Sequence, residues 1–243
     1  IVKHANPCGV SINKDHLKSY KLALACDPIS AFGGIVSCNF RINKKLATEL
    51  NKLFLEVIIA NGFDKDALKL LKKKKNLRLI DATNYSFKEI LRFISSNEEF
   101  LVQTEDLKKF SNNDFKIVSK KKPSSKQMKN LIFAFNICRY VKSNAIVLAS
   151  NETTAGIGSG QPSRLDSCQI AIDKMEKFTN INDDVVAASD AFFPFVDGIQ
   201  KLVQSGVSAV IQPSGSIRDK EIINFANETN TILVFSKTRH FRH

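Results

Sequence analysis

Residues 209–226 read AVIQPSGSIRDKEIINFA and have the form of a strand, a loop and a helix. A β-branched run ends at a Pro-Ser-Gly loop, and Asp219, Lys220 and Glu221 then open a helical pattern. An Asn-led strand, NTILVFS at 230–236, follows the helix. Strand, loop, helix and strand at this spacing predict a βαβ unit with a parallel pair of strands.

A second stretch repeats this design. Residues 57–71, VIIANGFDKDALKLL, are again a β-branched run, a Gly loop and a helical pattern, and NLRLIDA at 76–82 follows. A similar stretch precedes each unit: SAFGGIVS at 30–37 precedes the first, and SDAFFPFVD at 189–197 precedes the second. We therefore expect an α/β fold of two duplicated modules, at 1–83 and 131–243, with a connecting segment at 84–130.

An amphipathic helix is expected at the end of the connecting segment. Met128, Leu131, Phe135 and Cys138 recur at helical spacing behind Ser124 or Ser125 as the cap. The pattern runs to about residue 142 and leads into a strand at 145–149.

Composition excludes several classes of protein. The formal net charge is +12, but the lysine runs are not interleaved with aromatic residues as in a groove for single-stranded nucleic acid. The five cysteines form no CxxC motif, which argues against zinc and for free thiols in a reducing compartment. No run is long enough for a membrane helix and no signal peptide is recognisable, so we expect a cytoplasmic protein with neither membrane nor nucleic acid as partner.

Three stretches could carry chemistry. In KHANPCG at 3–9, turn-forming residues would hold Lys3 and His4 at a tight loop, as a cation and a general base, although a basic chain end would look the same. In AGIGSGQPSR at 155–164, a glycine loop would feed a helix near Ser163 and present N–H groups and Arg164 to an anion, or be a plain turn.

The third stretch is SDAFFPFVD, where Pro194 interrupts any strand. Its phenylalanines could be core residues or a clamp for a flat heterocycle, closed by Asp197. The tail TRHFRH at 238–243 follows a strand, and ligands of open α/β sheets lie at the carboxyl ends of strands. We expect the glycine loops of both halves and this tail to meet there.

Taken together, these motifs resemble one enzyme family. KHANPCG, SAFGGI, EVIIANG, KSNAI, GIGSGQPSR, SDAFFPFVD, QPSGSIRD and RHFRH occur in the order seen in the formyltransferase half of the bifunctional purine biosynthesis proteins. The resemblance implies formyl transfer from 10-formyltetrahydrofolate to the amine of 5-aminoimidazole-4-carboxamide ribonucleotide (AICAR), a cytidine-deaminase-like fold of two modules, each a mixed sheet flanked by helices, and a homodimer with shared sites.

The resemblance also assigns residues. His4 would be the proton acceptor and Lys3 the transition-state stabiliser. The nucleotide would be held by Gly33, Glu56, Asn144, Arg164, Phe192 and Arg239. The folate would be held by Leu165, Asp197, Ser216 and Ile217, with Ile29 and Phe32 near the pterin. No metal is implied.

The chain departs from the family pattern in three ways. Asn61 stands where the family commonly has proline, an upstream Arg-Tyr segment that touches the nucleotide is absent, and so is the cyclohydrolase half. Two other readings are open. A zinc-dependent deaminase would need a Glu two residues after its His ligand and a PCxxC, but Asn6 occupies the first place and no second cysteine follows Cys8. A basic nucleic-acid-binding module explains the charge but none of the motifs.

Overall fold

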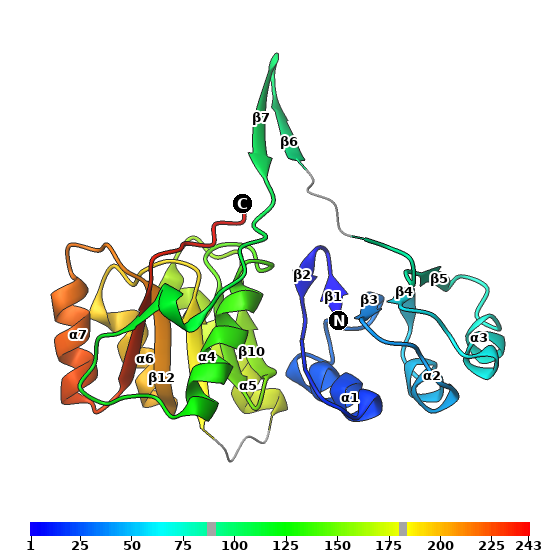
Figure 1. Cartoon of the computed structure of the whole chain (residues 1–243), viewed down its shortest axis with the longest axis horizontal. Coiled ribbons are helices and arrows are strands. Elements are labelled where there is room, and N and C mark those ends of the chain that lie inside the picture. The colour runs from blue at the N-terminus through cyan, green and yellow to red at the C-terminus, as the bar shows by residue number, and fades with distance from the viewer. Residues whose placement is uncertain (87–90, 180–183) are drawn as a thin grey trace.

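The computed structural model describes residues 1–86, 91–179 and 184–243 of the chain. Two α/β units lie side by side, and a two-stranded hairpin projects from the edge where the C-terminus lies (Figure 1). The chain thus has the mixed α/β architecture that the sequence predicts.

The first unit is a five-stranded sheet in the order β2-β1-β3-β4-β5. Strands β3, β4 and β5 are parallel, whereas β1 pairs antiparallel with both β2 and β3. The strands are β1 (Val2–Lys3), β2 (Asn6–Pro7), β3 (Gly34–Cys38), β4 (Leu55–Ala60) and β5 (Arg78–Asp81), and the helices are α1 (His16–Cys26), α2 (Lys44–Leu50) and α3 (Lys65–Leu71).

The second unit is a six-stranded sheet in the order β10-β9-β11-β12-β13-β8. Strands β11, β12 and β13 are parallel and the others antiparallel to their neighbours. The strands are β8 (Phe115–Ile117), β9 (Ile146–Ser150), β10 (Thr153–Gly158), β11 (Val185–Ser189), β12 (Val207–Pro213) and β13 (Ile232–Ser236). The helices are α4 (Ser125–Cys138), α5 (Arg164–Phe178), α6 (Val196–Gln204) and α7 (Asp219–Glu228).

Both predicted βαβ units are confirmed, as β4-α3-β5 and β12-α7-β13. The two sheets also share one connectivity, because an antiparallel hairpin and a helix precede three parallel strands in each. The origin of the halves by duplication and the boundaries at 83 and 130 stay predictions. The predicted connecting segment includes residues 87–90, which lie outside the described residues.

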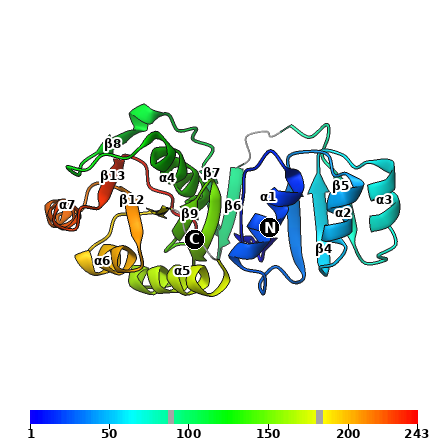
Figure 2. The same cartoon turned by 90° about the horizontal axis from the view of Figure 1, so that it is seen from below.

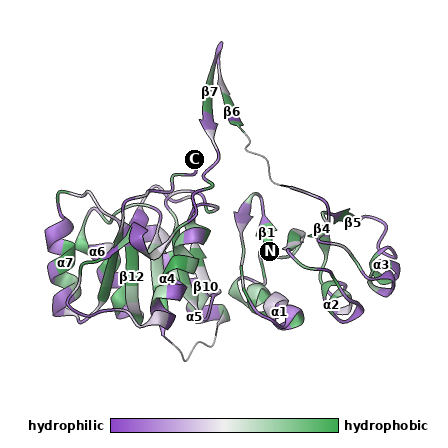
Figure 3. Cartoon of the chain, in the orientation of Figure 1, coloured by the Kyte–Doolittle hydropathy of each residue, from purple (hydrophilic) through white to green (hydrophobic). Residues whose placement is uncertain are grey.

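The second sheet is covered on both faces, with α4 on one face and α5 and α6 on the other (Figure 2). Successive residues of β11 alternate between the two layers: Val186 and Ala188 pack with α4, and Val185 and Ala187 pack with α5 and α6. This explains why its strands are continuous apolar runs, visible as green ribbon in Figure 3.

The first sheet has one covered face. Val36 and Ile58 pack against Leu46 of α2 and Leu71 of α3 in one core cluster. Neighbouring residues of the same strands point to the opposite face, where Ile35, Val57 and Ile59 are half-buried and Ile80 is exposed.

Helix α4 begins at the predicted cap. The Ser124 hydroxyl accepts from the Gln127 N–H, and the Gln127 side chain accepts from the Ser124 N–H, which completes a capping box. The helix ends at Cys138, some four residues earlier than the apolar pattern indicates.

Two of the three glycines predicted to form a loop lie in a strand. Gly156 and Gly158 belong to β10, where an added Cβ would meet the carbonyl oxygens of Ala171 and Ser167 of α5 at 2.0 and 1.9 Å. These glycines are therefore required by close strand–helix packing and not by a ligand. Only Gly160, with φ of 71°, turns the chain.

The two units are joined through α1. Asp27, which is 3% exposed, pairs with Lys174 of α5 at 2.9 Å, and the Val10 N–H donates to the Thr154 hydroxyl of β10 at 2.9 Å. Burial by itself raises the pKa of Asp27, but hydrogen bonds from Lys174 and Ser30 outweigh it and lower the pKa overall.

The hairpin between the units consists of β6 (Leu91–Ser96) and β7 (Glu99–Thr104), and we call it the arm. Leu91, Phe93, Phe100 and Val102 share one face of the arm, and Ile94 and Leu101 lie on the other; all six are at least 45% exposed. Both faces of this two-stranded hairpin therefore expose large apolar side chains to solvent.

No helix among the described residues is long and apolar enough to cross a membrane.

Candidate active site

The predicted base lies on a strained turn. His4 and Ala5 connect β1 to β2 and have φ of 48° and 65°, a left-handed conformation that residues other than glycine and asparagine rarely adopt. The turn-forming Asn6 and Pro7, by contrast, lie in β2. Strain of this kind costs about 1–3 kcal/mol per residue and collects at functional sites. His4 is exposed at the tip, which is the geometry of a group that meets a ligand.

Lys3 lies close to three other residues that were predicted to contact the substrates. Its ammonium donates to the carbonyl oxygen of Phe32, and it lies 3.1 Å from where a Cβ of Gly33 would be, so a larger residue at 33 would push it away. Ile29 and Phe32 are exposed beside it, with the Phe32 N–H donating to the Ile29 oxygen at 3.3 Å. Lys3, Ile29, Phe32 and Gly33 therefore form one group.

Glu56 stands apart from this group. It lies where the pairing of β4 with β3 is irregular, and it pairs at 3.0 Å with Arg78 of β5, which is in register with Val57 on the sheet face opposite the helices. The Gly62 loop of the first unit is also elsewhere: it follows β4, whereas Gly33 precedes the parallel strand β3, so the two loops lie at opposite ends of the sheet. The expectation that the glycine loops of both halves meet is therefore wrong for the first half.

In the second unit, the predicted residues converge at one edge. A cavity of about 490 Å³ is lined by residues that follow β10 and β11, with others from the tail after β13. The lining includes six predicted site residues: Asn144, Arg164, Leu165, Phe192, Asp197 and Arg239. The parallel strands β11 and β13 present their carboxyl ends here, where α/β sheets bind ligands.

Arg164 opens α5 as predicted, but its guanidinium points inward. It is 8% exposed, and it donates to Asp190 Oδ1 at 2.5 Å, to the Ser189 hydroxyl at 2.8 Å and to Asn144 Oδ1 at 2.6 Å. Asn144 is equally committed, since its amide N–H groups donate to the carbonyl oxygens of Gln161 and Pro162.

Asp190 is the centre of this network, and sequence reasoning assigned it no role. It is fully buried, and besides Arg164 it accepts from the Ser143 hydroxyl at 2.6 Å. Its backbone N–H donates to Ala145 and its carbonyl accepts from His240. Burying a carboxylate costs free energy unless it is paired. An aspartate that directly follows an apolar run is therefore the sequence signal that could have indicated a buried, paired group at this position.

Arg239 is the exposed arginine of the site. Its guanidinium lies over the Phe192 ring at 4.9 Å, and its Nη2 is 3.4 Å from where a Cβ of Gly215 would be. Ser216 follows this glycine and its N–H and that of Gly215 donate to Asp219, while Ile217 is fully exposed. Arg239 thus connects the tail to the loop after β12.

The phenylalanines of SDAFFPFVD differ in their surroundings, so they do not all lie in the core and do not all line the cavity. Phe193 is 1% exposed and packs in the core, Phe192 lines the cavity beneath Arg239, and Phe195 is half exposed under the Arg218 guanidinium at 4.7 Å. Asp197, in the first turn of α6, is exposed at the cavity and accepts from the Gly198 N–H.

The two groups are connected by the hairpin that carries His4. The Asn6 side chain accepts from the Lys142 N–H at 2.9 Å, and Lys142 precedes Ser143 and Asn144 of the cavity edge. In Figure 1 the β1–β2 turn and the C-terminus both lie on the side of the arm. The candidate site therefore combines an exposed imidazole and a lysine with a cavity lined by arginines, a carboxylate and an aromatic ring.

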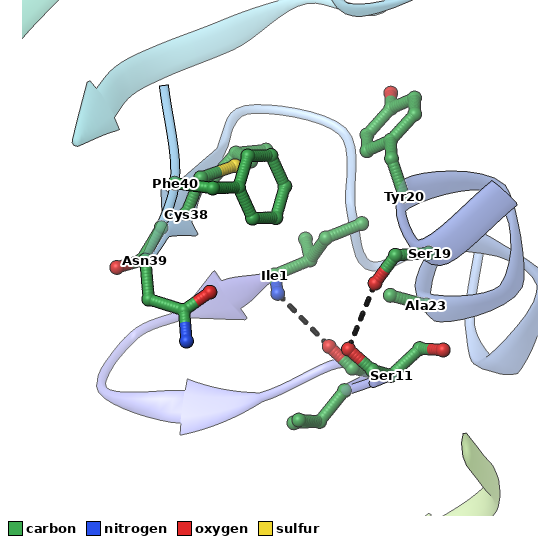
Figure 4. A pocket seen from close by; sticks show the side chains of 12 residues that line it. Ile1, Ser11, Ser19, Tyr20, Ala23, Cys38, Asn39 and Phe40 are labelled. Atoms are coloured by element: carbon green, nitrogen blue, oxygen red, sulfur yellow. Dashed lines mark hydrogen bonds between the residues drawn. The ribbon is translucent and has the colours of Figure 1, made fainter. Parts of the chain in front are cut away.

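A second cavity lies within the first unit, on the α1 side of the β1–β2 hairpin, between Ile1, Tyr20 and Phe40 (Figure 4). It measures about 100 Å³, and Ser19 beside it donates to the Ser11 carbonyl at 2.9 Å. It contains none of the predicted site residues and is too small for a nucleotide.

The described residues contain no group of three or more His, Cys, Asp or Glu side chains placed to hold a metal ion. All five cysteines are buried and free, and burial raises their pKa, to about 11 for Cys26 and Cys38 and about 12 for Cys168. Thiols with such values are inert as nucleophiles at neutral pH.

The protein is of the α/β class, and its ligand-sized cavity lies at the carboxyl ends of parallel strands, where proteins of this class bind ligands. Comparison with known proteins gives the family. The family described as AICARFT/IMPCHase bienzyme matches residues 1–174, and the chain belongs to this family.

Similar proteins cover the whole chain. It is 46% identical to the bifunctional purine biosynthesis protein PurH of Persephonella marina and 43% identical to those of Caldicellulosiruptor saccharolyticus and Leptospira biflexa. Each alignment covers 100% of this chain and 47–48% of the relative. The chain thus spans about half the length of the curated relatives it matches.

Proposed function

We propose that this chain transfers the formyl group from 10-formyltetrahydrofolate to the amine of AICAR, a step toward IMP in purine biosynthesis. The observation that carries the proposal is the convergence of Asn144, Arg164, Phe192, Asp197 and Arg239 on one cavity, in a chain of the AICARFT/IMPCHase family. The cyclohydrolase activity of the bifunctional relatives belongs, in this proposal, to sequence outside the chain.

The reaction needs a base and a cation. The amine of AICAR is attached to an aromatic ring beside a carboxamide, so its nitrogen is a weak nucleophile. As that nitrogen forms a bond to the formyl carbon, His4 accepts its proton and Lys3 stabilises the negative charge that develops on the formyl oxygen. The bond from the formyl carbon to N10 then breaks, and N10 takes up a proton to give tetrahydrofolate.

The exposed position of His4 on a strained turn supports its role, because the imidazole is free to meet the amine. Lys3 donates to a backbone carbonyl and not to a carboxylate, so its charge is not neutralised by that contact.

The cavity divides between the two substrates. Arg239 is exposed and suits the phosphate, the Phe192 ring suits the imidazole, and Arg164 and Asn144 form the polar wall. Asp197 can accept from the N–H donors of a pterin, and Leu165 lines the same cavity. Ser216 and Ile217, in the loop that Arg239 reaches, and Ile29 and Phe32, exposed on the first unit, supply the remaining folate contacts.

The proposal includes a homodimer with shared sites. The apolar arm and the open face of the first sheet, which carries Ile35, Val57, Ile59 and Ile80, are two surfaces that a second copy would cover. Glu56 pairs with Arg78 on that open face, so in a dimer it could reach the partner's nucleotide. Five free thiols also favour the reducing cytoplasm as the place of action.

The test is release of tetrahydrofolate by the full chain with and without AICAR. Formation of tetrahydrofolate together with formylated AICAR, in equal amounts, supports the proposal. Calorimetry with each substrate alone then tests the division of the cavity: Arg239→Ala should weaken the nucleotide and spare the folate, and Asp197→Ala should do the reverse. A chain that binds neither substrate refutes the proposed function.

A further inference from the structure

The C-terminal tail, residues 237–243, has no regular secondary structure, yet one of its side chains is completely enclosed. His240 is 1% exposed, whereas its neighbours Arg239 and Phe241 are exposed. Tails of this kind usually fray unless something fixes them. The burial of a single imidazole between two exposed residues indicates an anchor.

The anchor is built from the segment at the base of the arm and from α4. His240 Nδ1 lies 2.5 Å from Asp106 Oδ2, and the imidazole packs against the rings of Phe135 and Phe110, with centroids 4.5 and 5.4 Å away. Arg139, which directly follows α4, lies 3.6 Å from the other oxygen of Asp106 and donates to the Asp106 carbonyl at 3.1 Å. The carboxylate is therefore held from two sides.

The proton on His240 can be placed from these contacts. Nδ1 donates to the Asp106 carboxylate, and Nε2 is buried without a hydrogen-bond partner among the described residues. A protonated Nε2 would be an unpaired buried donor, so the neutral imidazole fits the site. Burial lowers the pKa of His240, although the pairing with Asp106 opposes this shift.

The backbone of the tail is tied to the cavity network at the same point. The His240 N–H donates to the Asp190 carbonyl at 2.9 Å, and the Ser143 N–H donates to the Arg242 carbonyl at 3.0 Å. Asp190 and Ser143 also bond each other through their side chains at 2.6 Å. Arg239, whose guanidinium covers Phe192 at 4.9 Å, directly precedes the first of these ties.

We propose that His240 is a positioning residue for the nucleotide: its bond to Asp106 fixes the tail so that Arg239 stays over Phe192 at the cavity. This inference rests on the proposed function for the identity of the ligand, but the anchoring contact does not. The side-chain partners of His240, Asp106, Phe110 and Phe135, lie at the base of the arm and in α4, outside the cavity lining. Of its two neighbours in the cavity lining, Arg239 and Phe241, the proposal assigns the effect on the nucleotide to Arg239.

Two variants of the full chain test the anchor from both sides. His240→Leu keeps a side chain that suits the aromatic surroundings but removes the donor, and His240→Asn keeps a donor at the place of Nδ1. Amide exchange of residues 238–242 should become at least tenfold faster in His240→Leu and be largely restored in His240→Asn. Asp106→Asn alters the same contact at a residue that is 39% exposed, and so remains usable if His240→Leu does not fold.

Calorimetry with AICAR tests the consequence. His240→Leu should raise the dissociation constant about tenfold, at the low end of the effect of losing a charge-assisted pair, while folate affinity changes less than twofold. In an Arg239→Ala background, His240→Leu should have no further effect on AICAR affinity. Lys109→Gln, at an exposed position of the same segment, is the matched control and should change nothing.

Unchanged amide exchange in both His240→Leu and Asp106→Asn would overturn the anchor, whatever the ligand. Faster exchange with unchanged AICAR affinity, or equal losses with and without Arg239, would overturn the positioning role. Failure of the wild-type chain to bind AICAR would instead refute the proposed function, and the exchange data would still decide the anchor.

Discussion

Removal of the charge of Asp190 should destabilise the chain more than any other single change at the site. The carboxylate is fully buried and bonds Arg164 at 2.5 Å and Ser143 at 2.6 Å. Asp190→Asn keeps the shape and one acceptor oxygen, but it leaves the guanidinium of Arg164, 8% exposed, without a counter-charge.

The magnitude follows from these contacts. Breaking a buried ion pair from one side costs about 3–5 kcal/mol, and the retained oxygen places this variant near 3 kcal/mol. For a chain of this size, a loss of about 3 kcal/mol lowers the melting temperature by roughly 6–12 °C. The exposed Asp184, just before β11 as Asp190 is just after it, provides a control, and Asp184→Asn should shift the melting temperature by less than about 2 °C.

Scanning calorimetry of the wild type, Asp190→Asn and Asp184→Asn measures these melting temperatures. Adding Arg164→Met to Asp190→Asn should recover part of the loss, because the double variant no longer buries an unpaired charge. If Asp190→Asn melted within 2 °C of the wild type, the ion pair would not be the centre of the site, and the reasoning from burial would be refuted.

Three further predictions concern stability, thiol chemistry and assembly. Because the pKa of Asp27 is lowered in the folded state, its contribution to stability is complete at pH values above its ordinary pKa of 3.8 and is lost as the pH falls through the folded-state pKa. The difference in unfolding midpoint between wild type and Asp27→Asn should therefore shrink below about pH 4. A constant difference from pH 6 to 3 would contradict this. The cysteines should resist iodoacetamide at pH 8 until the chain is unfolded, and rapid labelling of Cys168 in the folded protein, seen by mass spectrometry, would disprove their inertness. Phe93→Asp combined with Leu101→Asp on the arm should convert a dimer to a monomer in light-scattering measurements, and a dimer of unchanged strength would remove the arm from the interface.

The parallel units could be predicted from sequence because their signals are local. A β-branched run, a turn and a helical pattern determine each βαβ unit before any tertiary contact is known, as for β12-α7-β13. The helix cap at Ser124 is local in the same way.

The structure differs from the sequence predictions where tertiary contacts determine the local conformation. Gly156 and Gly158 look like a loop in sequence, but they allow β10 to pack closely on α5. The turn at His4 and Ala5 has no turn-forming residues, and only the pairing of β1 with β2 places it there.

The partners of Asp190 and of His240 lie far away in the chain, so no local pattern could identify them. The candidate residues themselves were found through their order along the chain, and the structure brings six of them to one cavity. Their roles stay predictions.

The central claim is that Lys3 and His4 perform formyl transfer. The most direct measurement is the rate of tetrahydrofolate release at saturating AICAR and 10-formyltetrahydrofolate, for wild type, His4→Ala and Lys3→Ala. We predict turnover lower by about 100-fold or more in both variants, with AICAR affinity nearly unchanged. Turnover within tenfold of wild type in both variants would contradict it.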